Sequence, residues 1–306
     1  MGALVTSSQL VLGLLPLVLT ACVMRPPAQG GPQTQAGVAG APTASTAPAG
    51  PPLSSDPKDT MIFLLLGQSN MAGAPSPEAE DEVEEPRVKV LAYEDCSRLG
   101  RRYNQWYTAK PPLHGCGGGL GPGDYFGRAI AKAFPNATIG LVPLAISGVD
   151  IDFFVKGVVS ARRHEFRIPP DDHWAGAYEW VVERARLAQQ SGAIRGIVFH
   201  QGESDTGSPQ WVGKVKRVVE ELRNDLNLGE VPFVAGELLY GGCCAQWHNP
   251  LIQQLPAAIS NSSVVSANGL AGIDAAHFDL PGQRELGARY GSAMLELMAR
   301  APNARP

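Results

Sequence analysis

The sequence predicts a three-layer α/β fold in which a mainly parallel sheet is covered by helices on both faces. Short continuous apolar runs alternate with amphipathic segments of helical spacing. Strands that alternate with helices in this way form doubly wound parallel sheets, whose strands are buried on both faces. The alternation begins near residue 59 of the 306-residue chain, so we expect one domain over residues 59–306.

The first half of the domain contains three apolar runs and one helical pattern. The runs predict strands at Met61–Leu66, Val88–Tyr93 and Thr138–Ile146. A helix is expected over Pro122–Ala133, because proline suits the first turn of a helix and apolar residues follow at helical spacing. The acidic stretch Glu78–Glu85 is interpreted as a solvated loop.

The second half continues the alternation. Apolar runs predict strands at Ile194–Phe199, Val231–Ala235 and Ser263–Ala267. Periodic patterns predict helices at Trp174–Gln190, Pro209–Leu226, Pro250–Ile259 and Pro281–Ala299. For the helix at Trp174–Gln190, Asp171 or Asp172 can cap the start and Gly192 can end it.

Two segments before residue 59 are expected to lie outside the domain. Residues 1–22 resemble a signal peptide that ends in a bacterial lipobox at Cys22, and an ordinary signal peptide is the alternative. Residues 23–58 are rich in Pro, Ala and Gly, which predicts a flexible linker. We therefore expect an exported protein, which is a cell-envelope lipoprotein anchored through Cys22, or otherwise a secreted or periplasmic protein.

Chemically useful residues follow the predicted strands. Ser69 comes just after the first strand, on a turn that Gly67 permits. A serine hydroxyl needs a neighbouring base to act as a nucleophile, and the base needs a group that orients it. Near the carboxyl terminus, Asp274 and His277 are three residues apart. These three side chains predict a nucleophile, a base and an orienting carboxylate, which meet at the carboxyl edge of the sheet.

Four motifs in this order resemble the SGNH hydrolases. They are Gly67-Gln68-Ser69-Asn70-Met71, the segment around Gly148, His200-Gln201-Gly202-Glu203-Ser204-Asp205, and Asp274-x-x-His277. More narrowly, they resemble the sialate O-acetylesterase and acetylxylan esterase branch, which is similar to carbohydrate esterase family 6. The resemblance implies a flavodoxin-like three-layer fold and an acetyl-enzyme formed on serine. It also implies an acetylated carbohydrate as substrate, with no metal or organic cofactor.

The sequence identifies the donors to the oxyanion less clearly than it identifies the three reacting side chains. The amides of Ser69 and Gly148 are the expected donors to a developing oxyanion. The broader SGNH pattern has an asparagine as third donor where this chain has Glu203, and an ionised glutamate cannot donate a hydrogen bond. Either Gln201 supplies the amide donor, or Glu203 has another catalytic role, in which it holds His277 or orients Gln201. Gln68 and Asn70 are further candidates for the oxyanion or substrate site.

Composition excludes some classes and leaves other questions open. The net charge of −4 and the scattered basic residues argue against nucleic-acid binding, and membrane contact is expected only through the lipid anchor. Dispersed histidines and the lack of a Cys-x-x-Cys pair argue against a zinc site. Of the remaining cysteines, a bond between Cys243 and Cys244 would be strained, so we expect each to pair with Cys96 or Cys116.

The function expected from these residues is removal of O-acetyl groups from sialic acid, xylan or a related glycan. The alternatives are an esterase that acts on other short-chain or peptidoglycan esters, and a non-catalytic carbohydrate-binding lipoprotein. Four aromatic residues in or beside loops are candidates for stacking on a sugar ring. They are Trp106, Trp174, Tyr240 and Trp247.

Overall fold

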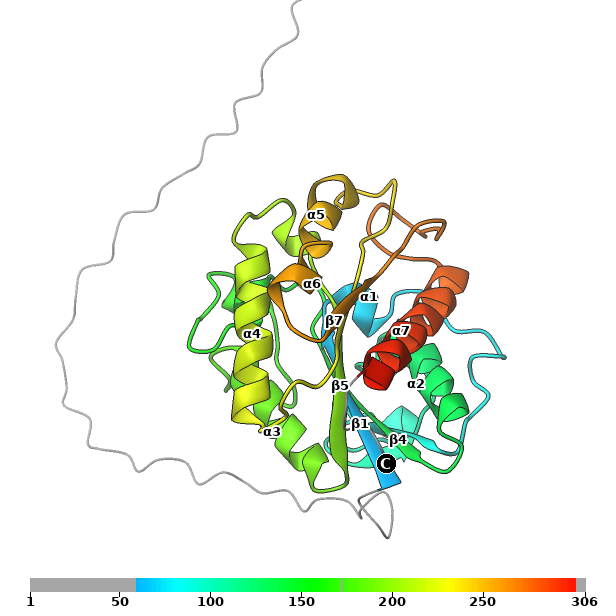
Figure 1. Cartoon of the computed structure of the whole chain (residues 1–306). Coiled ribbons are helices and arrows are strands. Elements are labelled where there is room, and N and C mark those ends of the chain that lie inside the picture. Colours follow the sequence, from blue (N-terminus) through cyan, green and yellow to red (C-terminus); the bar gives the residue numbers. More distant parts are fainter. Residues whose placement is uncertain (1–58, 172, 301–306) are drawn as a thin grey trace, which may run out of the picture. The chain divides into compact units, whose positions relative to one another are not determined.

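A seven-stranded sheet organises the computed structural model, which describes residues 59–171 and 173–300 (Figure 1). Its strands are β1 (Thr60–Gly67), β2 (Val88–Leu91), β3 (Trp106–Thr108), β4 (Thr138–Ala145), β5 (Ala193–His200), β6 (Phe233–Gly236) and β7 (Ser262–Val265). The predicted signal peptide, the lipobox at Cys22 and the linker lie outside the described residues.

The sheet has the order β3-β2-β4-β1-β5-β6-β7, and every pair is parallel except β2 with β3. The predicted doubly wound α/β fold is therefore confirmed. One detail differs from the flavodoxin order, in which the first strand lies between the second and the third. Here β1 lies between β4 and β5, and its carboxyl end is therefore central to the sheet edge.

Helices cover both faces of this sheet. They are α1 (Ser69–Ala72), α2 (Pro122–Ala133), α3 (Ala177–Gln189), α4 (Trp211–Asp225), α5 (Ala245–Ile252), α6 (Leu255–Ala258) and α7 (Leu280–Arg300). In Figure 1, α3 and α4 lie on one side of the sheet, and α2 and α7 lie on the other. No helix in the described ranges is both long and apolar enough to span a membrane.

The core explains why β1 is apolar throughout. Ile62, Leu64 and Leu66 pack into a buried cluster with side chains of α3 and α4. The alternate residues Met61, Phe63 and Leu65 pack into a second cluster with side chains of α2 and α7. Because successive side chains of a strand point to opposite faces, a strand covered on both sides must be apolar at every position.

Two expected helices differ from their predicted bounds, and one strand was not expected. The helix predicted from Trp174 begins at Ala177, and Gly176 before it offers no side-chain cap. The helix predicted over Pro250–Ile259 is instead the pair α5 and α6, with Pro250 inside α5. Strand β3 was not predicted, because a three-residue antiparallel edge strand is too short to leave a pattern.

The acidic stretch Glu78–Glu85 is not a purely solvated loop. The Asp81 side chain is fully buried and accepts hydrogen bonds from the Arg284 guanidinium and the Tyr125 hydroxyl. Arg284 belongs to α7 and also pairs with Glu78. The expectation is therefore wrong for Asp81, which anchors this stretch to the helix that follows the catalytic loop.

The disulfides correct a second expectation. The structure pairs Cys96 with Cys116 and Cys243 with Cys244, so the cross-pairing that we expected is wrong. The sheet order gives the reason. Cys96 follows β2 and Cys243 follows β6, and these strands are four positions apart, or roughly 19 Å at the usual spacing. Bonded cysteines need Cα atoms within about 7 Å of each other.

Removal of the Cys96–Cys116 disulfide is expected to destabilise the domain. The bond joins residues 20 positions apart, and its loss restores loop entropy to the unfolded chain. Replacing both cysteines with alanine should lower the free energy of unfolding by about 3 kcal/mol, measured by urea denaturation. A loss below about 1 kcal/mol would show that the bond constrains little.

Candidate active site

Ser69 emerges on a turn that only glycine permits. Gly67 ends β1 with φ of +143°, and a Cβ there would lie 2.0 Å from the carbonyl oxygen of His200. The next amide, of Gln68, donates to that same carbonyl at 2.9 Å. The turn is thereby tied to the end of β5, and Ser69 begins α1 at the carboxyl edge of the sheet.

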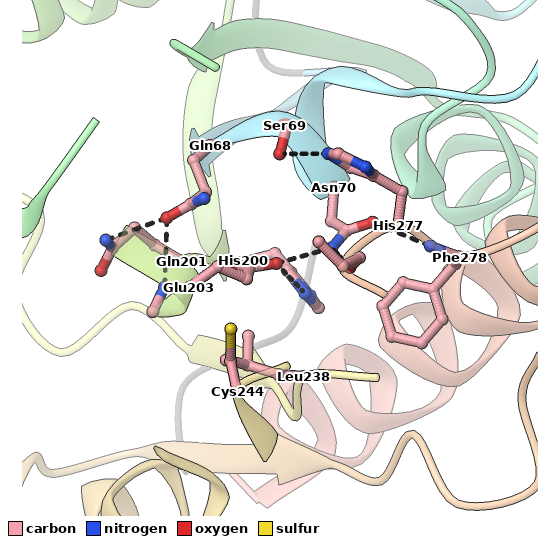
Figure 2. Close-up of polar contacts among 12 residues, drawn as sticks. Gln68, Ser69, Asn70, His200, Gln201, Glu203, Leu238, Cys244, His277 and Phe278 are labelled. Carbon is pink, nitrogen blue, oxygen red and sulfur yellow. Dashed lines mark hydrogen bonds and ion pairs between the residues drawn. The ribbon is translucent and has the colours of Figure 1, made fainter. Parts of the chain in front are cut away.

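The structure brings the three predicted side chains together, and Figure 2 shows Ser69 beside His277. The Ser69 hydroxyl donates to His277 Nε2, with Oγ and Nε2 2.9 Å apart. The other ring nitrogen, Nδ1, donates to Asp274 Oδ2 at 2.8 Å. This is the geometry of a serine nucleophile with a base and an orienting carboxylate. Residues 208 positions apart in the sequence therefore meet over one sheet edge.

Asp274 is held by its own loop. Its Oδ1 accepts from the amides of Ala276 and His277, at 2.7 and 2.8 Å, while Oδ2 accepts from the imidazole. The hydrogen bond from His277, followed by the two amides, lowers the pKa of Asp274 to about 2. The carboxylate therefore stays ionised at neutral pH, and its stabilising contacts are lost only as the pH falls through about 2.

Gly148 lies on the turn after β4, beside the Ser69 turn. The Ile146 amide donates to the carbonyl of Gly67 at 3.1 Å, which joins the two turns. The Gly148 carbonyl accepts from Ser204 Oγ at 2.8 Å and from Arg162 Nη1 at 3.2 Å. Among the described residues, the amides of Ser69 and Gly148 have no acceptor, so both remain available to a ligand.

Gln68 presents a free amide nitrogen. Its Oε1 accepts from the amides of Gly202 and Ser204, both at 3.4 Å, and from Gln201 Nε2 at 3.1 Å. Two backbone donors can be met only by the carboxamide oxygen, so the orientation of the side chain is fixed. Its Nε2 donates to no described residue, which leaves Gln68 as a candidate donor to substrate.

Gln201 does not supply the oxyanion donor, which corrects one of our expectations. Its buried Nε2 donates to Asp205 Oδ2 at 2.5 Å and to the Val149 carbonyl at 3.2 Å, besides Gln68. Its Oε1 accepts from Trp211 Nε1 at 2.6 Å. Both amide hydrogens are therefore bound to acceptors within the protein. Gln201 supports the Gln68 side chain and does not donate to substrate.

Glu203 also has a different place from the two that we expected. Its carboxylate hydrogen-bonds neither His277 nor Gln201; instead Oε1 accepts from Asn70 Nδ2 at 2.6 Å (Figure 2). Burial raises the pKa of Glu203. Asn70 also donates to the Ala276 carbonyl at 2.9 Å, so its amide hydrogens cannot serve substrate. The sequence held no signal for these contacts, which join residues 133 and 206 positions apart.

Two of the four candidate aromatic residues lie on the segment that follows the carboxyl end of β6. Tyr240 and Trp247 are 43% and 63% exposed. Their segment is tied to the catalytic loop, because the Cys243 amide donates to the Ala275 carbonyl at 2.7 Å. Trp106 is elsewhere: its Nε1 donates to Ser191, near the amino end of β5. Trp174 packs against the buried cluster that includes the side chains of α3 and α4. Tyr240 and Trp247 are therefore the better candidates for carbohydrate contact.

A doubly wound sheet with a serine, an imidazole and a carboxylate joined at its carboxyl edge defines an SGNH-type carboxylic ester hydrolase. The chain belongs to the carbohydrate esterase, sialic acid-specific acetylesterase family, whose model matches residues 59–296. It is similar to a probable carbohydrate esterase of Arabidopsis thaliana, with 28% identity over 264 residues that cover 80% of this chain and 94% of that protein.

Solved structures share this fold. An X-ray structure of an Arabidopsis thaliana protein matches with a TM-score of 0.63 and 26% identity, over 80% of this chain and 99% of that one. NanS shares the fold, with a TM-score of 0.61 and 19% identity over 79% and 98% of the chains. A carbohydrate acetylesterase of Xanthomonas citri also shares it, with a TM-score of 0.56 and 16% identity over 77% and 56%.

Proposed function

We propose that this chain removes O-acetyl groups from carbohydrate through an acetyl-enzyme formed on Ser69. The observation that carries the proposal is the hydrogen bond of 2.9 Å between Ser69 Oγ and His277 Nε2. Membership of a family described as sialic acid-specific acetylesterase supports an acetylated sugar as substrate. The carbohydrate acetylesterase activity named for the Xanthomonas citri protein agrees with this interpretation.

In the acylation step, the Ser69 hydroxyl proton moves to His277 Nε2 as Oγ attacks the acetyl carbonyl carbon. In this proposal, the amides of Ser69 and Gly148 and Gln68 Nε2 donate hydrogen bonds to the resulting oxyanion and stabilise it. Asp274 holds the Nδ1–H tautomer and stabilises the imidazolium that forms. The imidazolium then gives its Nε2 proton to the departing sugar oxygen, and the carbon–oxygen bond to the sugar breaks.

In the second step, His277 takes a proton from water, and the resulting hydroxide attacks the acetyl-serine. The same donors stabilise the second oxyanion. Collapse of this intermediate releases acetic acid, which ionises to acetate in water, and the proton on His277 Nε2 returns to Ser69 Oγ. The cycle thus consumes one water and returns every group of the enzyme to its starting protonation state.

A substrate panel tests this function. Purified protein is given O-acetylated sialic acid, acetylated xylan, O-acetylated peptidoglycan and 4-nitrophenyl esters of increasing acyl length, and acetate or nitrophenol is measured. We expect release from an acetylated sugar and a steep fall beyond short acyl chains. Preference for long acyl chains would contradict the proposal. Sugar binding without turnover, and without labelling of Ser69 by a fluorophosphonate, would favour the non-catalytic alternative.

Replacement of Trp247 is expected to weaken carbohydrate binding without slowing the chemical steps. Its exposed ring can stack on a sugar, and one such contact contributes about 1 kcal/mol. Trp247→Ala should therefore raise KM for an acetylated glycan about fivefold, while kcat/KM for 4-nitrophenyl acetate stays within twofold. The matched control is Trp106→Phe, which changes an indole away from this edge. Equal losses on both substrates would show that Trp247 is structural.

Export and lipid anchoring remain proposals from sequence. They rest on the apolar run Leu10–Leu19 and on the lipobox that ends at Cys22. The two disulfides of the described domain support an oxidising compartment, where such bonds persist. An anchor followed by the linker of residues 23–58 would hold the esterase at the cell envelope and within reach of glycans.

A further inference from the structure

The side chain of Asn70 connects the nucleophile turn to the catalytic loop. Asn70 follows Ser69 directly in the sequence and is fully buried. Its Nδ2 donates to the Ala276 carbonyl at 2.9 Å, and its Oδ1 accepts from the Phe278 amide at 3.1 Å. These two backbone groups stand on either side of His277. The Asn70 carboxamide therefore fixes the backbone on both sides of the catalytic histidine.

Glu203 is a third partner of this carboxamide, and Gln283 Nε2, which donates to Asn70 Oδ1 at 3.4 Å, is a fourth. Asn70 Nδ2 has two hydrogens: one goes to the Ala276 carbonyl and the other to Glu203 Oε1 at 2.6 Å (Figure 2). If the carboxamide were flipped, its oxygen would face two acceptors and its nitrogen would face the Phe278 amide. Only one orientation satisfies all four partners, and a bond to a carboxylate is among the stronger ones in a protein.

We propose that Asn70 is a positioning residue that sets the distance between Ser69 and His277, and that Glu203 is the acceptor that locks the Asn70 carboxamide in place. This inference rests on the proposed serine esterase function. It assigns a role to the glutamate that stands where the broader SGNH pattern has an oxyanion donor. Glu203 works from behind the reacting atoms, through Asn70, and does not touch substrate.

The groups behind Glu203 argue against a simple ion pair. His200 Nε2 lies 3.8 Å from Glu203 Oε1, but burial lowers the pKa of this histidine to about 3, so the ring is neutral. The Tyr290 hydroxyl donates to the Phe199 carbonyl at 3.1 Å and therefore accepts from His200 Nδ1, 2.8 Å away. Nε2 is then left without a proton and cannot donate to Glu203.

The burial of the Glu203 carboxylate also argues against a role in stabilising the fold. Glu203 Oε2 is buried and has no hydrogen-bond partner among the described residues. A buried carboxylate that lacks a cationic partner destabilises a fold relative to an apolar side chain of similar size. A role in global stability therefore explains Glu203 poorly. A role in the geometry of the site explains why its one strong side-chain donor is the residue next to Ser69.

The test is a double-mutant cycle on Asn70→Ala and Glu203→Ala. Steady-state kinetics with 4-nitrophenyl acetate are run at a temperature where melting curves show that each variant is folded. A displacement of the histidine by about 1 Å is expected to lower kcat about 100-fold in each single variant. KM should stay within about threefold, because neither residue contacts substrate. The double variant should lose no more than the worse single variant, because both act through one link.

Two further variants separate positioning from stability. Glu203→Gln keeps an acceptor oxygen for Asn70 and should recover at least about tenfold of the kcat lost in Glu203→Ala. Glu237→Ala removes another buried glutamate at the same sheet edge, one that accepts from Gln253 and Ser266. It should lower the melting temperature while kcat stays within about threefold. If Asn70→Ala does not fold, the comparison of Glu203→Ala with Glu203→Gln tests the proposal by itself.

Multiplicative losses in the double variant, or equal effects of Glu203→Ala and Glu237→Ala on kcat, would overturn the inference. So would a Glu203→Gln variant that is as slow as Glu203→Ala. These failures differ from a failure of the proposed function. If the function is right and the inference wrong, Ser69→Ala still abolishes turnover, whatever the size of the loss in Glu203→Ala. If the function is wrong, Ser69→Ala itself stays active.

Discussion

Ser69→Ala is expected to lower kcat for 4-nitrophenyl acetate by roughly 10⁴-fold or more while the fold stays intact. The reason is geometric. Ser69 Oγ is 2.9 Å from His277 Nε2, and no other side-chain hydroxyl of the described residues hydrogen-bonds that nitrogen. Residual turnover would come only from the oxyanion donors and a bound water. Nitrophenol release, corrected for the uncatalysed rate, is the measurement.

Ser208→Ala is the matched control for this variant. Ser208 lies beyond the end of β5, is partly exposed, and its hydroxyl donates only to Gln210 at 3.3 Å. Its loss should leave kcat within twofold. If Ser69→Ala kept more than about 1% of the activity with melting behaviour like that of the parent protein, the nucleophile would have to be another group.

Asp274→Asn is expected to lower kcat by about 10³-fold or more, although it changes a single atom. In the parent protein, Oδ1 of Asp274 accepts from the amides of Ala276 and His277. An asparagine oxygen would keep these two bonds, so its NH₂ group would fall opposite His277 Nδ1. That group donates, which forces the imidazole proton onto Nε2. A protonated Nε2 cannot accept the proton of Ser69.

Asp279→Asn is the control for the charge change on the same loop. Asp279 lies two residues after His277, and its Oδ1 accepts from the Gly282 amide at the start of α7. An asparagine keeps that acceptor, so kcat should stay within about threefold. A comparable loss in both variants would assign the effect to the net charge of the loop, and the orienting role of Asp274 would then be refuted.

The sequence predicted the reacting groups well because each has a local signal. Ser69 follows a glycine that ends an apolar run, and Asp274 and His277 are three residues apart. The rule that parallel strands present their carboxyl ends at one edge then brings distant segments together. Gly148 was found in the same way, from its position after β4.

The supporting contacts were not predictable, because they depend on which side chains surround a residue after folding. Glu203 was expected near His277 or Gln201, and the structure gives it Asn70 instead. Gln201 was expected to face substrate, yet its amide is committed to Asp205 and Val149. A motif specifies which residues lie at the end of a strand, and it does not specify the direction in which each amide points.

Long-range contacts explain the remaining errors. The disulfide pairing depends on β2 and β6 being on opposite sides of β1, which no local pattern encodes. The burial of Asp81 likewise depends on Arg284, which is 203 positions away. Local propensity therefore gave the elements and their approximate bounds, and long-range packing decided the rest.

The most direct test of the serine mechanism is rapid quenching of the enzyme with an acetyl ester, followed by mass spectrometry of its peptides. We expect an acetyl group on the peptide that contains Ser69, formed in the first turnover, lost at the rate of acetate release and absent from Ser69→Ala. Turnover without an acetylated Ser69, or an acetyl group that accumulates on another residue with matching kinetics, would contradict this mechanism.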